Sequence, residues 1–159
     1  MVSNTHGIRL AKPSDVKDLA CIERESFSDP WPASAFADVL LMPSASMIVA
    51  TDANDRAVGC CILLNAADQG EIANLAVARH ARRQGTAAGL LVQAITIAQS
   101  KGVVAIFLEV RASNEAARAL YRAHDFSEIG RRGGYYQRPT EDALVLQWSA
   151  TSAVKTVTE

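Results

Sequence analysis

The chain has 159 residues, of which 49% are hydrophobic and 21% are charged, and its formal net charge is −1. These values predict one folded domain with a sizeable core, and the near-neutral charge excludes the basic balance that direct nucleic-acid binding asks of a whole domain. No uncharged apolar run reaches membrane-spanning length and the N-terminus lacks the apolar core of a signal peptide, so we expect a cytoplasmic protein without a membrane partner.

The first half of the chain gives alternating helix and strand signals. Apolar residues recur at helical spacing after Pro13, and the segment 28–32 breaks that helix with two prolines, the second of which can open another. The turn-rich segment 52–55 separates two apolar runs and predicts a hairpin. In chain order we expect a strand at 8–11, helices at 16–27 and 32–41, and strands at 47–50, 57–64 and 71–77.

The second half predicts a parallel crossover. A helix from Gly85 to about Lys101 leads into the run 103–110, which is apolar almost throughout, as in a central strand covered on both faces. A right-handed crossover would place that strand beside 71–77. Gly133-Gly134 predicts a loop between the last two strands. We expect a helix at 113–124, strands at 127–132 and 142–148, a domain spanning 1–148 and a polar, disordered tail at 149–159.

The stretch Arg82–Ala88, between a strand and a helix, is the most informative part of the chain. Gly85 and the small alanines after it let the backbone turn tightly, so that amides at the helix start point toward an anion that the helix dipole already favours. Arg82 and Arg83 add positive charge suited to phosphate. We interpret the stretch as a pyrophosphate cradle. The alternative is a small-residue turn that only lets a strand and a helix pack closely.

The three cysteines and three histidines lack metal-binding spacing. We therefore expect no metal and no disulfide framework, and we interpret the cysteines as small buried hydrophobes. Cys60 and Cys61 lie in the middle of an expected strand rather than beside a histidine, which argues against a covalent acyl-enzyme.

The expected elements follow the order β-α-α-β-β-β-α-β-α-β-β, with a glycine turn after the fourth strand. Six short motifs accompany this order: FSDPW at 27–31, NLAV at 74–77, RRQGTA at 82–87, LEVRASN at 108–114, ALY at 119–121 and RGGYY at 132–136. The element order and the motifs resemble the GNAT superfamily of acyl-coenzyme A transferases over residues 7–148, and within it the RimI family, the bacterial ribosomal-protein-alanine N-acetyltransferases. The resemblance implies an α/β fold with a single mixed, mostly antiparallel sheet, splayed between strands 4 and 5 and flanked by about four helices.

The resemblance implies that acetyl-CoA lies in the splay, paired with the fourth strand almost as an added strand. An unpaired strand edge offers amide donors for the thioester oxygen and acceptors for the pantetheine amides. Asn114 would add a further coenzyme contact, with helix capping as its alternative role. The implied coenzyme-binding residues are Leu75, Ala76, Val77, Arg82, Arg83, Gln84, Gly85, Thr86, Ala87, Ala88 and Asn114.

Glu109 and Tyr121 match the catalytic residues of the resembled family. Glu109 ends an apolar strand, so we expect its carboxylate to face the cleft, where partial desolvation raises its basicity and suits a general base. Its alternative role is an ion pair with Arg111 or another surface cation. Tyr121 matches the proton donor to the coenzyme thiolate, with packing in the core as its alternative. Glu71 either attracts the acceptor's ammonium or is a solvated strand end.

Trp31, Tyr135 and Tyr136 are expected in loops, where aromatic side chains are less often core. The resemblance puts such segments at the peptide entrance, so we expect them to line the acceptor groove, with simple packing as the alternative.

The implied activity is direct transfer of acetyl from acetyl-CoA to a protein N-terminal α-amine, in the family the N-terminal alanine of the eighteenth small-subunit ribosomal protein, by a monomeric enzyme. The alternatives are a GNAT enzyme acting on lysine side chains or small amines, and a non-catalytic acyl-CoA sensor. Such a sensor need keep the glycine turn but neither Glu109 nor Tyr121, and the chain has both.

Overall fold

The computed structural model describes residues 7–150, and the order of their elements confirms the expected one. Every helix in this part of the chain is too short or too polar to cross a bilayer. The tail expected at 149–159 lies, beyond Ala150, outside the described residues. The elements are β1 (Gly7–Leu10), α1 (Val16–Ser26), α2 (Ala33–Leu40), β2 (Ala45–Thr51), β3 (Ala57–Ala66), β4 (Gln69–Val77), α3 (Thr86–Ser100), β5 (Ala105–Arg111), α4 (Glu115–Ala123), β6 (Ser127–Tyr136) and β7 (Glu141–Ser149), with short 3-10 turns η1 (Pro13–Asp15) and η2 (Arg79–Ala81).

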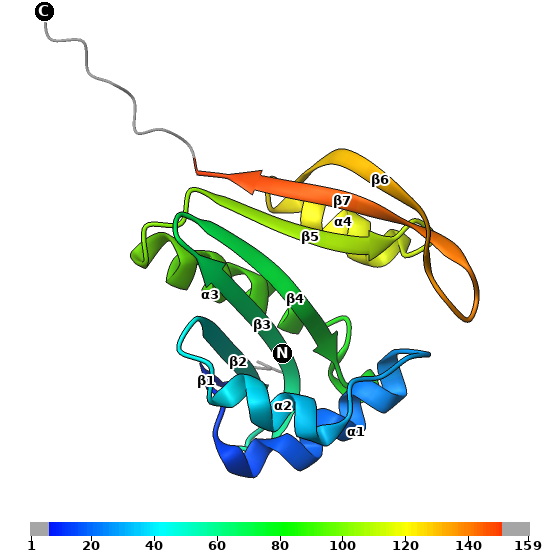
Figure 1. Ribbon diagram of the computed structural model, residues 1–159. Helices are drawn as coiled ribbons and strands as arrows, with labels where there is room; N and C mark the ends of the chain where they lie inside the picture. The colour runs from blue at the N-terminus through cyan, green and yellow to red at the C-terminus, as the bar shows by residue number, and fades with distance from the viewer. Residues whose placement is uncertain (1–6, 151–159) are drawn as a thin grey trace, which may run out of the picture.

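The strands form one sheet in the order β1-β2-β3-β4-β5-β7-β6, in which only the β4–β5 pair is parallel. That pair is short, because Gln69–Glu71 pairs with Ala105–Phe107 and the two strands then diverge, as Figure 1 shows. The expected splay between strands 4 and 5 is therefore confirmed. It divides the sheet into a β1–β4 half and a β5–β7–β6 half joined by three residue pairs.

Helices cover both faces of the first half of the sheet, with α1 and α2 on one side and α3 on the other (Figure 1). The central strands β2 and β3 are consequently buried along most of their length and are apolar almost throughout. Cys60 and Cys61 are buried in β3 as expected. The same expectation is wrong for Cys21, which is exposed because it occupies the solvent side of the amphipathic helix α1.

The loop expected at Gly133-Gly134 is also wrong, because both glycines belong to β6. Pairing moves from Arg132 opposite Ala143 to Tyr136 opposite Glu141, so residues 133–135 bulge opposite one residue of β7. Gly134 has a φ of +61°, which glycine adopts without strain. A glycine pair signals a loop and a bulge equally well.

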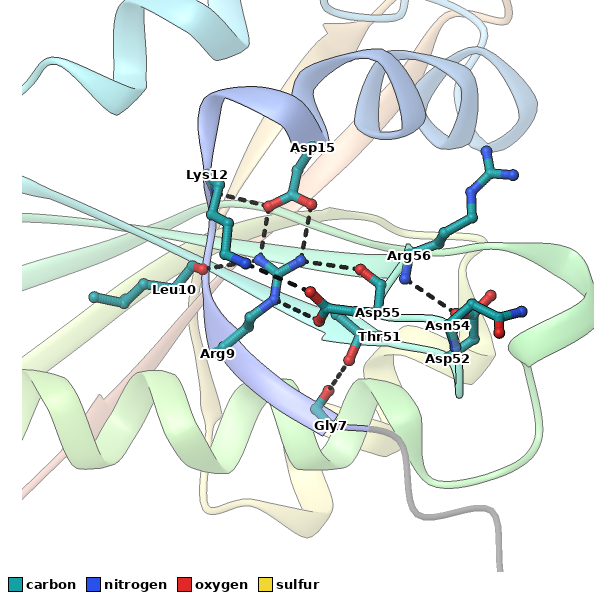
Figure 2. A network of polar contacts seen from close by, with 10 residues as sticks. All are labelled: Gly7, Arg9, Leu10, Lys12, Asp15, Thr51, Asp52, Asn54, Asp55 and Arg56. Carbon is teal, nitrogen blue, oxygen red and sulfur yellow. Dashed lines mark hydrogen bonds and ion pairs between the residues drawn. The ribbon is translucent and has the colours of Figure 1, made fainter.

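An ion-pair network fixes the first strand and the first turn (Figure 2). The guanidinium of Arg9 donates to both oxygens of Asp15 at 2.8 and 3.0 Å, and its Nε donates to Asp55 in the β2–β3 hairpin at 2.9 Å. The main-chain N–H of Lys12 also donates to Asp15, at 2.7 Å. These bonds satisfy the buried Asp15 carboxylate and tie β1, η1 and the hairpin together.

Candidate active site

The divergence of β4 and β5 leaves a cleft of about 690 Å³, within the size range of small-molecule sites. Its walls come from α1, the α1–α2 connection, β4, β5, α4 and the end of β6. Several residues named from the sequence line it together: Trp31, Leu75, Glu109, Asn114, Tyr121, Tyr135 and Tyr136. Glu71 lines it as well, at the last paired position of β4.

A bulge in β4 sits where that strand leaves β5. Ile62 of β3 pairs with Asn74 and Leu63 pairs with Ile72, so Ala73 is the extra residue. Beyond Glu71 no described strand pairs with the β5-facing edge of β4, so residues 72–77 present main-chain donors and acceptors there. Leu75 lies at the cleft, whereas the predicted contacts Ala76 and Val77 lie further along the strand and do not line it.

The turn from 82 to 85 follows η2 and begins α3. Arg83 and Gly85 both have positive φ, +61° and +78°, and no side chain among the described residues caps the start of α3. Apart from the adjoining backbone, no described residue comes within 4 Å of the place that a Cβ on Gly85 would take, so the turn is open on that side. An uncapped helix start with an open glycine fits an anion such as a pyrophosphate.

Arg82 does not project freely from this turn. Its Nε donates to the main-chain oxygen of Val77 at 2.9 Å and its Nη2 donates to Ser26 at 3.3 Å. Thr86, also named from the sequence, is buried and donates to the main-chain oxygen of Ala81 at 3.0 Å. Arg82 thus braces the turn against the end of β4 and Thr86 braces it against η2, structural roles that the sequence did not indicate.

Glu109 faces the cleft from β5, and its side chain is 24% exposed. An oxygen of its carboxylate lies 3.2 Å from the guanidinium of Arg132 on β6. An ion pair was the alternative role expected for Glu109, and its partner is Arg132 rather than Arg111. A hydrogen bond with Glu109 is also the main cause that raises the pKa of the Tyr135 hydroxyl. Two β6 side chains therefore orient the carboxylate.

Tyr121 is buried on α4 and yet reaches the cleft. Its ring packs edge-on against Phe126, with 5.6 Å between the centroids. Burial raises the pKa of its hydroxyl, so the phenol keeps its proton at neutral pH. Tyr121 was expected either at the cleft or in the core, and its position meets both expectations because the ring packs in the core and the residue also lines the cleft.

Asn114 caps helix α4. Its side-chain oxygen accepts the N–H of Ala117 at 3.1 Å, so the capping role is present. Because Asn114 also lines the cleft, a contact with the coenzyme stays a prediction.

The aromatic residues named from the sequence do lie at the cleft, in different settings. Trp31 lies in the α1–α2 connection, and its ring centroid is 5.6 Å from that of Phe36. The expectation of a loop is wrong for Tyr135 and Tyr136, which end β6. Tyr136 stacks under the guanidinium of Arg111 at 4.5 Å.

Two charged residues shape the cleft walls in ways that the sequence did not predict. Arg111 donates to the main-chain oxygens of Gln137 and Pro139 at 2.9 and 3.0 Å, which holds the β6–β7 turn beside the cleft. Glu23 on α1 is buried and accepts from Trp31 and Asn74. Neither role has a local sequence signal, since each depends on partners from other elements. Within residues 7–150, no three His, Cys, Asp or Glu side chains gather as a metal site would require.

Comparison with known proteins agrees with this geometry. Residues 16–126 match the acetyltransferase (GNAT) family. The ribosomal protein bS18-alanine N-acetyltransferase of Salmonella typhimurium is 32% identical over 143 residues, covering 87% of this chain and 94% of that protein. The crystal structure of the Escherichia coli ribosomal-protein-S18-alanine N-acetyltransferase has a TM-score of 0.86 and 27% identity over 98% of this chain and 100% of that one.

A crystal structure of Arabidopsis thaliana NAA60 in complex with acetyl-CoA shares the fold, with a TM-score of 0.84 and 19% identity over 92% of this chain and 100% of that one. The family match covers well over half of the chain, and the Salmonella relative is matched over nearly its whole length. The chain therefore belongs to the GNAT family of acetyltransferases and, within it, to the RimI family of N-acetyltransferases.

Proposed function

We propose that the enzyme transfers acetyl from acetyl-CoA to the N-terminal α-amine of a protein, and that its acceptor is the N-terminal alanine of ribosomal protein bS18. The observation that carries the proposal is the meeting of Glu109 and Tyr121, from β5 and α4, in one cleft beside the open edge of β4. A proton acceptor, a proton donor and free amides are what acyl transfer to an amine requires. An acceptor of this kind would place the enzyme in the cytoplasm.

The residues present fit acetyl-CoA, which supplies an activated acetyl thioester when bound. The open edge at 72–77 can pair with the pantetheine amides as a strand would. The uncapped start of α3 and the open Gly85 would hold the pyrophosphate, with Arg83 as the nearby cation. Arg82 would support the turn through Val77 rather than bind phosphate directly.

In the proposed reaction the amine nitrogen bonds to the thioester carbonyl carbon, and the carbon–sulfur bond breaks. Glu109 takes the proton that the amine loses, directly or through water. Amides of the β4 edge donate to the carbonyl oxygen as it gains negative charge. Tyr121, whose burial keeps it protonated, returns a proton to the departing sulfur. The transfer leaves Glu109 protonated and Tyr121 as a phenolate, and one proton passing from Glu109 to Tyr121 through solvent restores both groups for the next cycle.

The two buried cysteines support direct attack. Burial raises the pKa of Cys61 to about 12 and that of Cys60 well above its usual value. A thiol in that state offers almost no thiolate at neutral pH, so neither side chain suits an acyl-enzyme.

Three synthetic peptides would test the acceptor. The first carries the N-terminal sequence of bS18, the second is identical except for a blocked α-amine, and the third begins with Met instead of Ala. Mass spectrometry after incubation with acetyl-CoA locates the acetyl group. We expect α-acetylation of the first peptide and no product from the blocked peptide. Acetylation of lysine in the blocked peptide, at a rate similar to that of the first, would contradict the proposal.

A further inference from the structure

Glu23 is a buried carboxylate that the proposed chemistry does not use. The residue is 3% exposed and lies at the inner wall of the cleft. One of its oxygens accepts the main-chain N–H of Trp31 at 3.1 Å, and the other accepts the side-chain amide of Asn74 at 2.9 Å. These two hydrogen bonds use one acceptor position on each oxygen. Among the described residues, no cation faces the carboxylate at ion-pair distance.

A carboxylate in this position costs stability. Burial raises the pKa of Glu23, and the hydrogen bonds from Asn74 and Trp31 offset only part of that effect. Burying an apolar side chain of similar size would destabilise the fold less than burying this carboxylate. What an apolar side chain lacks is the ability to hold two donors from separate elements at fixed positions.

The two donors belong to different elements of the cleft wall. Trp31 lies in the α1–α2 connection, and its ring packs at a tilt against Phe36. Asn74 lies on β4, directly after the Ala73 bulge and inside the edge that has left β5. The Glu23 carboxylate therefore links the α1–α2 connection, which carries Trp31, to the open strand β4.

We propose that Glu23 is a positioning residue that sets the distance between the Trp31 wall and the open edge of β4. This inference rests on the proposed function, in which Trp31 lines the acceptor groove and β4 holds acetyl-CoA. The amine can attack only where the acceptor and the thioester meet at bonding distance, so loss of the bridge would weaken productive binding of the peptide.

Asn74 makes a discriminating substitution possible. Its side-chain oxygen is buried and has no hydrogen-bond partner among residues 7–150. In Glu23→Gln the new amide would donate to that oxygen once the Asn74 amide turns over, while the Gln oxygen still accepts the N–H of Trp31. Glu23→Gln therefore keeps the bridge and removes the charge, whereas Glu23→Ala removes both. Asp18→Ala, on the same helix but bonded to Arg56 outside the cleft, is the matched control.

The test combines steady-state kinetics with fluorine NMR of fluorotryptophan-labelled protein. The chain has two tryptophans, and Trp148 on β7 serves as an internal reference for the fold. In Glu23→Ala we expect the Trp31 resonance to shift or broaden with the Trp148 resonance unchanged, and the KM for the bS18 peptide to rise about 10-fold or more. The KM for acetyl-CoA should stay within about 2-fold of the parent value. Glu23→Gln and Asp18→Ala should resemble the parent in every readout.

Two results would overturn the inference: an unmoved Trp31 resonance in Glu23→Ala, or a peptide KM that rises as much in Glu23→Gln as in Glu23→Ala, which would assign the effect to charge. If Glu23→Ala fails to fold, Asn74→Ala is tested instead, because it removes the hydrogen bond between Glu23 and β4. In that variant the Trp31 resonance must shift while the Trp148 resonance stays in place, and the KM for the peptide must rise. Failure of the proposed function appears separately, as a parent enzyme that does not α-acetylate the peptide, while the resonances still report on the bridge.

Discussion

Glu109 lies between the cleft and Arg132, and this setting makes its proposed role testable. Glu109→Gln preserves the shape of the side chain but cannot take the amine's proton, so kcat should fall by about 100-fold or more. Calorimetry should give an unchanged affinity for acetyl-CoA. Glu128→Gln, an exposed position on β6, controls for the loss of one negative charge. A Glu109→Gln enzyme with near-parental kcat across the pH range would remove Glu109 from the mechanism.

Tyr121 combines a core ring with a hydroxyl whose raised pKa favours the protonated phenol. Tyr121→Phe removes only the oxygen and keeps the contact with Phe126, so the melting temperature should change little. We expect kcat to fall by about 10-fold, a limited loss because a thiolate departs tolerably well without a proton. Melting temperature and kcat are measured on one preparation. Full activity, or a loss explained by unfolding, would return Tyr121 to a purely structural role.

At the level of elements, α3 carries its own matched control for the proposed pyrophosphate turn. Gly85 begins the helix and Gly102 follows its end, and their φ values are +78° and +77°. Apart from the adjoining backbone, no atom of the described residues lies within 4 Å of the Cβ position at either glycine. Valine at either position should cost about 1–2 kcal/mol of stability through backbone strain.

Only Gly85→Val should also lose affinity for acetyl-CoA, because only there does the added side chain stand where the phosphates would lie. Calorimetry on both folded variants measures the difference. Equal affinity in Gly85→Val and Gly102→Val would separate the turn from coenzyme binding.

Across the whole molecule, the sequence predicted what depends on local pattern and not what depends on distant partners. Apolar periodicity and turn residues placed the strands and helices in order, and the family words placed Glu109 and Tyr121 at one cleft. The bulge at Ala73 exists only relative to β3, so β4 alone does not reveal it. Glu23 looks like any glutamate on an amphipathic helix, because its partner Asn74 is 51 residues away in the sequence.

Asp15 and Glu23 are the two buried carboxylates of the described chain, and their environments shift their pKa values in opposite directions. Burial alone would raise the pKa of Asp15, but the hydrogen bonds from Arg9 and Lys12 outweigh it and lower that pKa. No cation in the described part of the chain pairs with Glu23, and burial raises its pKa. Asp15 therefore stabilises the fold above its unfolded pKa of about 3.9 and loses that contribution as the pH falls through its lower folded value. The contribution of Glu23 to the stability of the fold is greatest below its unfolded pKa of about 4.3, and that contribution is lost as the pH rises through its folded pKa.

Urea unfolding of the parent, Asp15→Asn and Glu23→Gln between about pH 3 and pH 8 should separate these contributions. Near neutral pH, Asp15→Asn should be less stable than the parent by about 2 kcal/mol, because it loses the charge-assisted bonds to Arg9, and the difference should shrink below about pH 4. The stability of Glu23→Gln relative to the parent should instead improve as the pH rises. Asp38→Asn, at an exposed position of α2, controls for net charge. A constant Asp15→Asn difference over the whole range would mean that the Arg9 network does not hold Asp15 as a carboxylate.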